Sequence, residues 1–363
     1  MEIIIYISAF IVAFANYIVN VSLPLYLSEL LNATPLQIGI AGFMGSFAYT
    51  LTTFTFSKLK SSQKFPWFIY ASFGIGTAYF LIPFFSYRII ILLLFISGFF
   101  HGRFWPSMAN YFRKREKREY SVGIYNLSWS GGVMAGSFFS GKIYSFGPSL
   151  PFITGGILGI SVFFLLFSTK KKFLPFFNIN FSQKTYKKID FPLSFVKRVR
   201  LLNFSTFFTV GAITFLFPKF LLILKFPSFL IGILISILYF SRTLFFYIMK
   251  GKPHIYRGRI SFLYLYILIF FGLLLIGTGS NIFVFTLSML ILGSLNGFSY
   301  YNSLLLHLSG GYPVEMNEVL VGAGFFSGPL IVGILSTLFN LRIAFILIGV
   351  GILIAGLLNE KKS

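Results

Sequence analysis

Three side chains that carry or can gain a positive charge lie inside long apolar stretches of the sequence: His101, Arg103 and Arg242. A charge at the depth of a lipid bilayer is costly, so such residues indicate a functional site by default. All eight acidic residues fall in loops or at the ends of the stretches, which predicts no carboxylate at the centre of one. Because arginine stays charged, an arginine without an acid favours the binding of an anion.

Polar residues recur at helical spacing around Arg242. Ser236, Tyr239 and Arg242 share one face of a helix, because residues three and four apart project in the same direction. Tyr49 lies on the matching face of an earlier stretch, and two such faces opposite each other would line a cavity. Alternatively, Arg242 bonds to helix carbonyls or extends its charge toward the membrane surface.

Histidine side chains titrate near neutral pH, so His101 is a candidate for relaying a proton. The alternative is a packed, hydrogen-bonded histidine. His101 and Arg103 lie roughly 200° apart around a helix, so they face different directions. The remaining candidates for solute contact are polar residues that could equally bond to neighbouring helices. These are Asn16, Asn20, Asn126, Asn296 and Tyr300.

The apolar stretches themselves predict an all-α polytopic membrane protein. Apolar residues make up 56% of the 363 residues and charged residues 10%, against about 25% charged in soluble domains. Twelve stretches approach or exceed the roughly 20 residues that cross a bilayer. They are 3–23, 36–57, 66–86, 89–111, 121–143, 150–168, 200–223, 228–249, 260–279, 281–305, 316–339 and 341–358.

The placement of the basic residues predicts the topology. Of 30 Lys and Arg, 23 fall on the side that carries both termini, five on the other side and two inside the stretches. Loops rich in Lys and Arg face the cytoplasm. We therefore expect a multi-pass protein of the cell membrane with both termini in the cytoplasm. The net charge of +22 is explained without nucleic acid.

The second six stretches echo the first. Gly39 aligns with Gly232 at an offset of 193 residues, and the glycines at 132, 136 and 141 align with those at 324, 328 and 333 at an offset of 192. Glycines four apart let helices approach closely in lipid. This predicts two six-helix bundles, 1–169 and 200–363, joined by a basic linker, 170–199, which either lies on the inner leaflet or forms a solvated loop.

Three segments resemble the major facilitator superfamily. Residues 34–39 resemble the start of its second helix, 98–106 its glycine-rich fourth helix, and 324–333 a glycine–proline pattern of its antiporter-like members. Residues 57–60 keep the basic residues of the family's loop between helices 2 and 3 but lack its acid. The resemblance implies transport by alternating access, with solute bound between two similar halves.

We therefore predict a secondary active or facilitative transporter of a small solute, with a lean to an organic or inorganic anion. The alternative is efflux of drug-like, hydrophobic compounds, followed by a non-transporting membrane sensor or scaffold. The sequence shows no cluster of nucleophile, base or metal ligands, so we do not expect an enzyme, and we expect no metal or cofactor. The chain has no cysteine, so disulfides are excluded. Membrane lipid is an expected partner, and we expect a monomer.

The charge asymmetry generates a test of topology. Cysteines introduced singly into this cysteine-free chain should react with an external, membrane-impermeant label at Asn32 and Asn340. Those at Ser61, Tyr186 and Ser363 should react only after the membrane is permeabilised. External labelling at Tyr186 would contradict the six-plus-six arrangement.

Overall fold

The twelve predicted stretches correspond to twelve α-helices in a computed structural model, which describes residues 2–57, 61–112, 118–171, 173, 191–249, 261–310, 312 and 314–360. No strand occurs among these residues. Most of the predicted linker lies outside the described part of the chain. The helices are α1 (Glu2–Glu29), α2 (Pro35–Ser57), α3 (Ser61–Leu81), α4 (Tyr87–Phe112), α5 (Arg118–Phe146), α6 (Leu150–Ser168), α8 (Leu193–Ile223), α9 (Ser228–Met249), α10 (Phe262–Thr278), α11 (Ile282–Ser309), α12 (Val314–Leu338) and α13 (Leu341–Glu360).

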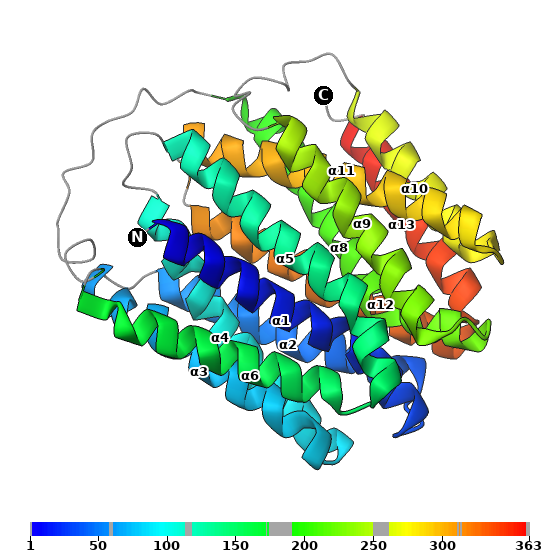
Figure 1. The fold of residues 1–363 in the computed structure, drawn as a ribbon. Coiled ribbons are helices and arrows are strands. Elements are labelled where there is room, and N and C mark those ends of the chain that lie inside the picture. Colours follow the sequence, from blue (N-terminus) through cyan, green and yellow to red (C-terminus); the bar gives the residue numbers. More distant parts are fainter. Residues whose placement is uncertain are drawn as a thin grey trace.

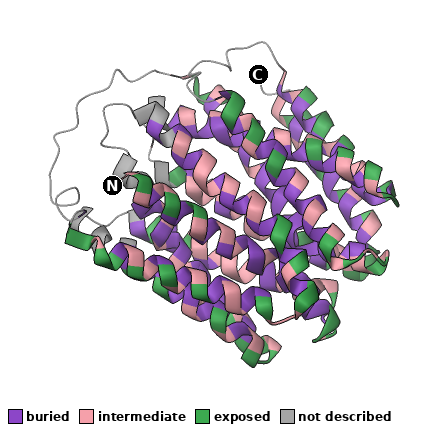
Figure 2. Cartoon of the chain, viewed as in Figure 1, coloured by how far each residue is buried: buried purple, intermediate pink, exposed green. Residues whose placement is uncertain are grey.

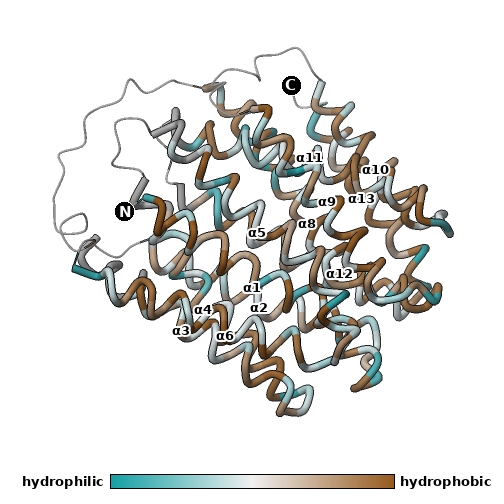
Figure 3. Tube along the Cα trace, in the orientation of Figure 1, coloured by the Kyte–Doolittle hydropathy of each residue, from teal (hydrophilic) through white to brown (hydrophobic). Residues whose placement is uncertain are grey.

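Eight of these helices are long and apolar enough to cross a membrane, and α10 is a shorter apolar helix. The exact number of crossings stays a prediction. Large apolar side chains such as Phe73, Phe164, Leu268 and Ile354 are exposed on α3, α6, α10 and α13. Exposed apolar surface along whole helices is what contact with lipid requires. Many of the hydrophilic residues lie near helix ends (Figure 3).

Figure 1 places both chain termini at the same end of the helices. We call this the inner end, because the basic residues predict that it faces the cytoplasm, and we call the opposite end the outer end. We refer to α1–α6 as the N-half and to α8–α13 as the C-half. The predicted repeat reappears in the packing. In the N-half α1 packs on α5, α2 on α4 and α3 on α6, and in the C-half α8 packs on α12, α9 on α11 and α10 on α13.

Helices α1 and α8 occupy the centre, and buried residues extend along most of α8 (Figure 2). Helix α1 continues past Pro24 to Glu29, beyond the end of the predicted stretch 3–23. Proline is tolerated inside spanning helices when the surroundings satisfy the freed carbonyl. Helix α2 begins with a capping box, in which the Thr34 hydroxyl accepts from the Gln37 amide and the Gln37 side chain accepts from the Thr34 amide.

The two halves meet most closely along α2 and α12 and along α5 and α9. Near the outer end, a Cβ atom on Gly39 would lie 2.5 Å from the Pro329 carbonyl oxygen and 3.3 Å from the Cα of Gly333. A Cβ on Gly232 would lie 2.8 Å from the Ser137 oxygen and 3.0 Å from the Gly141 nitrogen. The repeat relates these two pairs, Gly39–Gly333 and Gly141–Gly232, which we call the outer contacts.

Because the outer contacts join backbone to backbone, they should not tolerate a side chain. A Cβ at Gly141 would clash with the Ser228 carbonyl and lie 2.9 Å from the Phe229 Cα. We expect Gly141→Ala to destabilise the protein by about 1–3 kcal/mol, the usual cost of overpacking. Thermal unfolding in detergent measures this effect.

Gly351→Ala is the matched control, because no heavy atom lies within 4 Å of a Cβ at that position in α13. Replacing glycine by alanine in an unobstructed helix is favourable by up to about 1 kcal/mol. An unfolding midpoint for Gly141→Ala as high as that for Gly351→Ala would show that the outer contacts are not tight.

Candidate functional site

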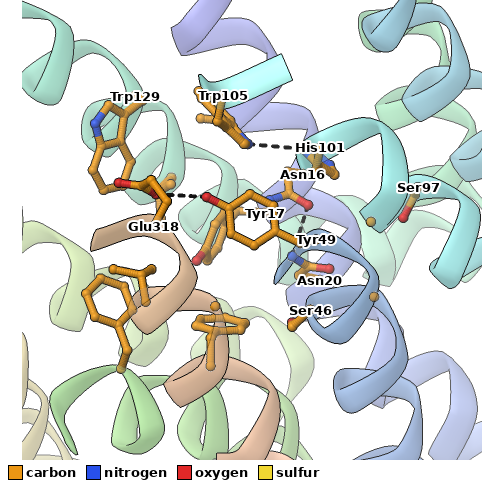
Figure 4. A pocket seen from close by; sticks show the side chains of 18 of the residues that line it. Asn16, Tyr17, Asn20, Ser46, Tyr49, Ser97, His101, Trp105, Trp129 and Glu318 are labelled. Atoms are coloured by element: carbon orange, nitrogen blue, oxygen red, sulfur yellow. Dashed lines mark hydrogen bonds between the residues drawn. The ribbon is translucent and has the colours of Figure 1, made fainter. Parts of the chain in front are cut away.

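A cavity of about 230 Å³ lies between the two halves. Its wall combines N-half residues from α1 to α5 with C-half residues from α8, α9, α11 and α12. Asparagine and serine side chains lie there among the aromatic rings of tyrosine, tryptophan and phenylalanine (Figure 4). Seven of the ten predicted site residues line it: Asn16, Asn20, Tyr49, His101, Asn126, Arg242 and Tyr300.

The structure does not bring the other three predicted residues to the cavity wall. Tyr239 lies behind Arg242, with its hydroxyl 3.2 Å from that of Tyr17. The guanidinium of Arg103 stacks on the rings of Trp67 and Phe99, 3.6 and 4.0 Å from their centroids. Asn296 is fully buried inside the C-half, where its amide donates to Thr206.

His101 belongs to a chain of hydrogen bonds that joins α4, α3 and α1. The Trp105 indole donates to Nδ1 of His101 at 3.1 Å, so Nδ1 must accept. Nε2 lies 2.8 Å from the Tyr79 hydroxyl, which donates to the Asn16 side-chain oxygen. The Asn20 amide donates to that same oxygen at 3.0 Å. This order implies the neutral Nε2–H tautomer, inferred from the network.

A proton added to His101 would have to sit on Nδ1, facing the N–H of Trp105. Two donors would then point at each other, so protonation requires Trp105 to move. The structure therefore supports the packed, hydrogen-bonded histidine rather than the proton relay. His101 instead holds Asn16 in position through Tyr79, and Asn16 lines the cavity.

Arg242 is almost fully buried, with 1% of its surface exposed. Its Nε donates to the Ser130 hydroxyl of the N-half at 3.1 Å. Its guanidinium carbon lies 4.7 Å from the ring centroid of Trp129 and 4.5 Å from that of Tyr239. Stacking on aromatic rings stabilises a cation where water is scarce. Nη2 has no hydrogen-bond partner among the described residues, so its two N–H groups are unpaired beside the cavity that Arg242 lines.

Glu318 is a cavity residue that the sequence analysis missed. It lies four residues after the start of α12 and lines the cavity. The expectation that no acid would accompany the arginine inside the stretches is therefore wrong for the cavity. Two features of the sequence are consistent with this position. The repeat offset of 192 pairs Glu318 with Asn126, a predicted site residue. Glu318 is also followed at helical spacing by three residues that line the cavity, Val321, Gly322 and Phe325.

The carboxylate of Glu318 bonds to both halves. Tyr49 of α2 donates to Oε2 at 2.8 Å, and Tyr300 of α11 donates to Oε1 at 3.1 Å. Figure 4 shows the bond between Glu318 and Tyr49 at one side of the cavity. One acid and one arginine thus share the wall, and their charges balance when both are ionised.

Comparison with known proteins identifies the family. The sequence model of the Major Facilitator Superfamily matches residues 5–323. The chain belongs to the Major Facilitator Superfamily. It is therefore a multi-pass membrane transporter of a small solute and not an enzyme. A search of curated proteins finds no match by sequence.

Solved structures show that this superfamily member shares its fold with diverse transporters. The nucleoside transporter NupG aligns at 15% identity with a TM-score of 0.74, over 99% of both chains. The human organic anion transporter MFSD10 (TETRAN) aligns at 14% identity and 0.68, over 99% and 98%. A bacterial homologue of the human lysosomal transporter Spinster, inward-facing and occupied, aligns at 11% identity and 0.76, over 99% and 95%.

In this superfamily member a second set of repeat-related contacts joins the halves beside the cavity, nearer the inner end. On α2 and α12, Thr50 lies against Gly322, next to the bond between Tyr49 and Glu318. On α9 and α5 the equivalent Thr243 lies 2.7 Å from the Ser130 hydroxyl, which also binds Arg242. We call the pairs Tyr49–Glu318 and Ser130–Arg242 the inner contacts.

The network around His101 predicts a structural cost for the loss of the Tyr79 hydroxyl. Tyr79→Phe leaves Nε2 of His101 and the oxygen of Asn16 each without one partner. Unsatisfied buried groups cost about 1–3 kcal/mol, so the unfolding midpoint should fall. Tyr264→Phe on α10, where the ring is 66% exposed, is the control and should leave the midpoint unchanged. Equal midpoints for the two variants would contradict the network.

Proposed function

We propose that the chain moves a small polar solute across the membrane by alternating access, with the solute bound in the cavity between the halves. The observation that carries this proposal is that residues of both halves form the wall of one cavity. A site shared by two bodies changes its exposure when the bodies rock against each other. The outer and inner contacts flank this site on its two sides.

We infer that residues 1–169 and 200–363 are the two moving bodies. Each half repeats the helix packing of the other, and the contacts between them gather on α2 with α12 and α5 with α9. Helix α8 begins at Leu193, so its first turns belong to the predicted linker. The basic residues at the inner end support a cell-membrane protein with cytoplasmic termini.

The solute that suits the cavity best is a polar molecule without net charge that carries a flat ring. The Asn16 and Asn20 amides and the unpaired Nη2 of Arg242 offer hydrogen bonds, whereas Trp105 and Trp129 offer ring faces. Aromatic faces add about 0.5–1.5 kcal/mol to the binding of another ring beyond simple burial. Nucleosides have these properties; one fold neighbour is a nucleoside transporter, but at 15% identity this likeness too concerns the fold alone.

The lean to an anion rested on an arginine without an acid, and Glu318 removes that premise. One neighbour is an organic anion transporter, but at 14% identity the likeness concerns the fold alone. Efflux of drug-like compounds would suit the aromatic part of the wall but not its buried amides. Organic anions and drug-like compounds are therefore the two alternatives that an experiment should separate from a neutral polar solute.

A panel of three probes tests the solute class. The purified protein is incubated with uridine, benzoate or tetraphenylphosphonium, which are a neutral nucleoside, an organic anion and a lipophilic cation. A ligand that binds only the folded state raises the unfolding midpoint. We expect the largest shift with uridine. The largest shift with benzoate would support an anionic solute, and the largest shift with tetraphenylphosphonium would favour efflux of drug-like compounds.

Variants of Arg242 test the site itself. Loss of a hydrogen bond from a charged group costs about 1.5–3 kcal/mol, or roughly 10- to 150-fold in affinity. We expect Arg242→Gln to weaken uridine binding, measured by calorimetry, by this factor. Arg242→Lys should also weaken it, because lysine lacks the planar guanidinium. Exposed Arg88 at the start of α4 gives the control Arg88→Gln, which should bind as the wild type does.

A further inference from the structure

Two asparagine side chains lie one turn apart on α1 and both line the cavity, Asn16 and Asn20. Figure 4 shows the hydrogen bond that joins their amides. An asparagine can present either its oxygen, which accepts, or its nitrogen, which donates, so its orientation decides which solutes it can bind. At this pair the surrounding hydrogen bonds determine the orientation.

The order of donors begins at Trp105. The indole N–H can only donate, so Nδ1 of His101 accepts and Nε2 carries the proton. The Tyr79 hydroxyl accepts from Nε2 at 2.8 Å and donates its own proton to Oδ1 of Asn16. In this order every donor has an acceptor, so the oxygen of Asn16, rather than its nitrogen, faces Tyr79.

The oxygen of Asn16 accepts a second bond, because the Asn20 amide donates to it at 3.0 Å. Its two lone pairs are then both occupied. Among the described residues, Nδ2 of Asn16 has no acceptor and Oδ1 of Asn20 has no donor, and both side chains line the cavity. The pair therefore offers a solute one N–H donor and one carbonyl acceptor in a fixed arrangement.

His101 also holds a ring face in place. The rings of His101 and Trp105 are nearly parallel, with 6° between their planes and 6.3 Å between their centroids. Trp105 lines the cavity as Asn16 does. One buried histidine thus fixes, through its two ring nitrogens, both a flat aromatic face and a hydrogen-bonding edge of the wall.

We propose that the Asn16–Asn20 pair reads the edge of the solute ring and selects a ring with an acceptor and an N–H donor side by side, such as the C=O and N–H of a ring amide. The solute carbonyl accepts from Nδ2 of Asn16, and the adjacent N–H of the solute donates to Oδ1 of Asn20. Tyr79 is a positioning residue, because it holds the Asn16 amide in this order. The proposal rests on the proposed function, since the edge belongs to the solute that the cavity carries.

A solute without the N–H should bind poorly. A site built to bind a polar group rejects an analogue that lacks it, because a buried partner is then left without a hydrogen bond. N3-methyluridine is the matched probe, since it keeps the sugar, the ring and the neutral charge of uridine but has a methyl group in place of the ring N–H. We expect calorimetry to show that it binds the wild type roughly 5- to 150-fold more weakly than uridine does.

Variants assign this discrimination to the pair. Asn20→Leu keeps nearly the shape of asparagine but has no acceptor, so the ratio of the two affinities should fall to about one. Tyr79→Phe releases the Asn16 amide and should lower the ratio too, whereas a purely structural loss would weaken both probes equally. Asn302→Leu on α11 is the matched control and should keep the wild-type ratio, because Asn302 donates to the Phe298 carbonyl of its own helix and lies outside the cavity wall.

The ratio decides the proposal independently of the proposed function. Uridine binding with equal affinities for the two probes in the wild type would overturn the reading of the edge and leave the proposed function intact. A wild-type ratio in Asn20→Leu would also overturn it.

A second pair of probes applies if uridine does not bind. 2-Pyridone is a flat ring amide without a sugar, and 1-methyl-2-pyridone is the same ring without the N–H. A larger rise of the unfolding midpoint with 2-pyridone in the wild type, and equal rises in Asn20→Leu, would refute the nucleoside and support the edge. Equal effects of the two pyridones in the wild type would overturn the edge as well.

Discussion

The structure depends on one constraint: a polar atom inside a lipid-embedded bundle must find its partner within the protein, because lipid offers none. Helices satisfy the backbone, and many buried side-chain polar atoms are satisfied by partners from distant parts of the chain. Tyr79 holds His101 and Asn16 together across three helices, and Ser130 of one half satisfies the Arg242 Nε of the other. The same bonds that make burial possible therefore also shape the cavity wall.

This constraint divides the interface between the halves by chemistry. Glycine pairs such as Gly39–Gly333 bring helices together through packing alone, which protonation leaves unaffected. The bond between Tyr49 and Glu318 depends on charge. The repeat relates Tyr49 to Arg242 and Glu318 to Asn126, whereas Arg242 bonds to Ser130, so the repeat preserves helix packing but not the polar contacts. Thr50 and Thr243 occupy equivalent sites, but one faces a glycine and the other a serine hydroxyl.

The sequence predicts the helices and the repeat well, because apolar length and glycine spacing are local signals. It predicts partners poorly. His101 is recognisable as a titratable group, but its bond to Tyr79 depends on how α3 packs against α4. Glu318 is placed at a span end because it is the third residue of the predicted stretch 316–339. In the structure α12 begins at Val314, and the approach of α2 and α11 encloses the carboxylate. Tertiary contacts, rather than hydropathy, decide on which side of the boundary such a residue falls.

Charge balance in the cavity follows from the same reasoning. An isolated Arg242 would attract an anion, whereas an isolated Glu318 would attract a cation. Because both line one cavity and both interact with Tyr300, the two charges reduce each other's distant field but keep their local hydrogen-bonding directions. Such a wall selects a solute by the positions of its donors and acceptors more than by its net charge.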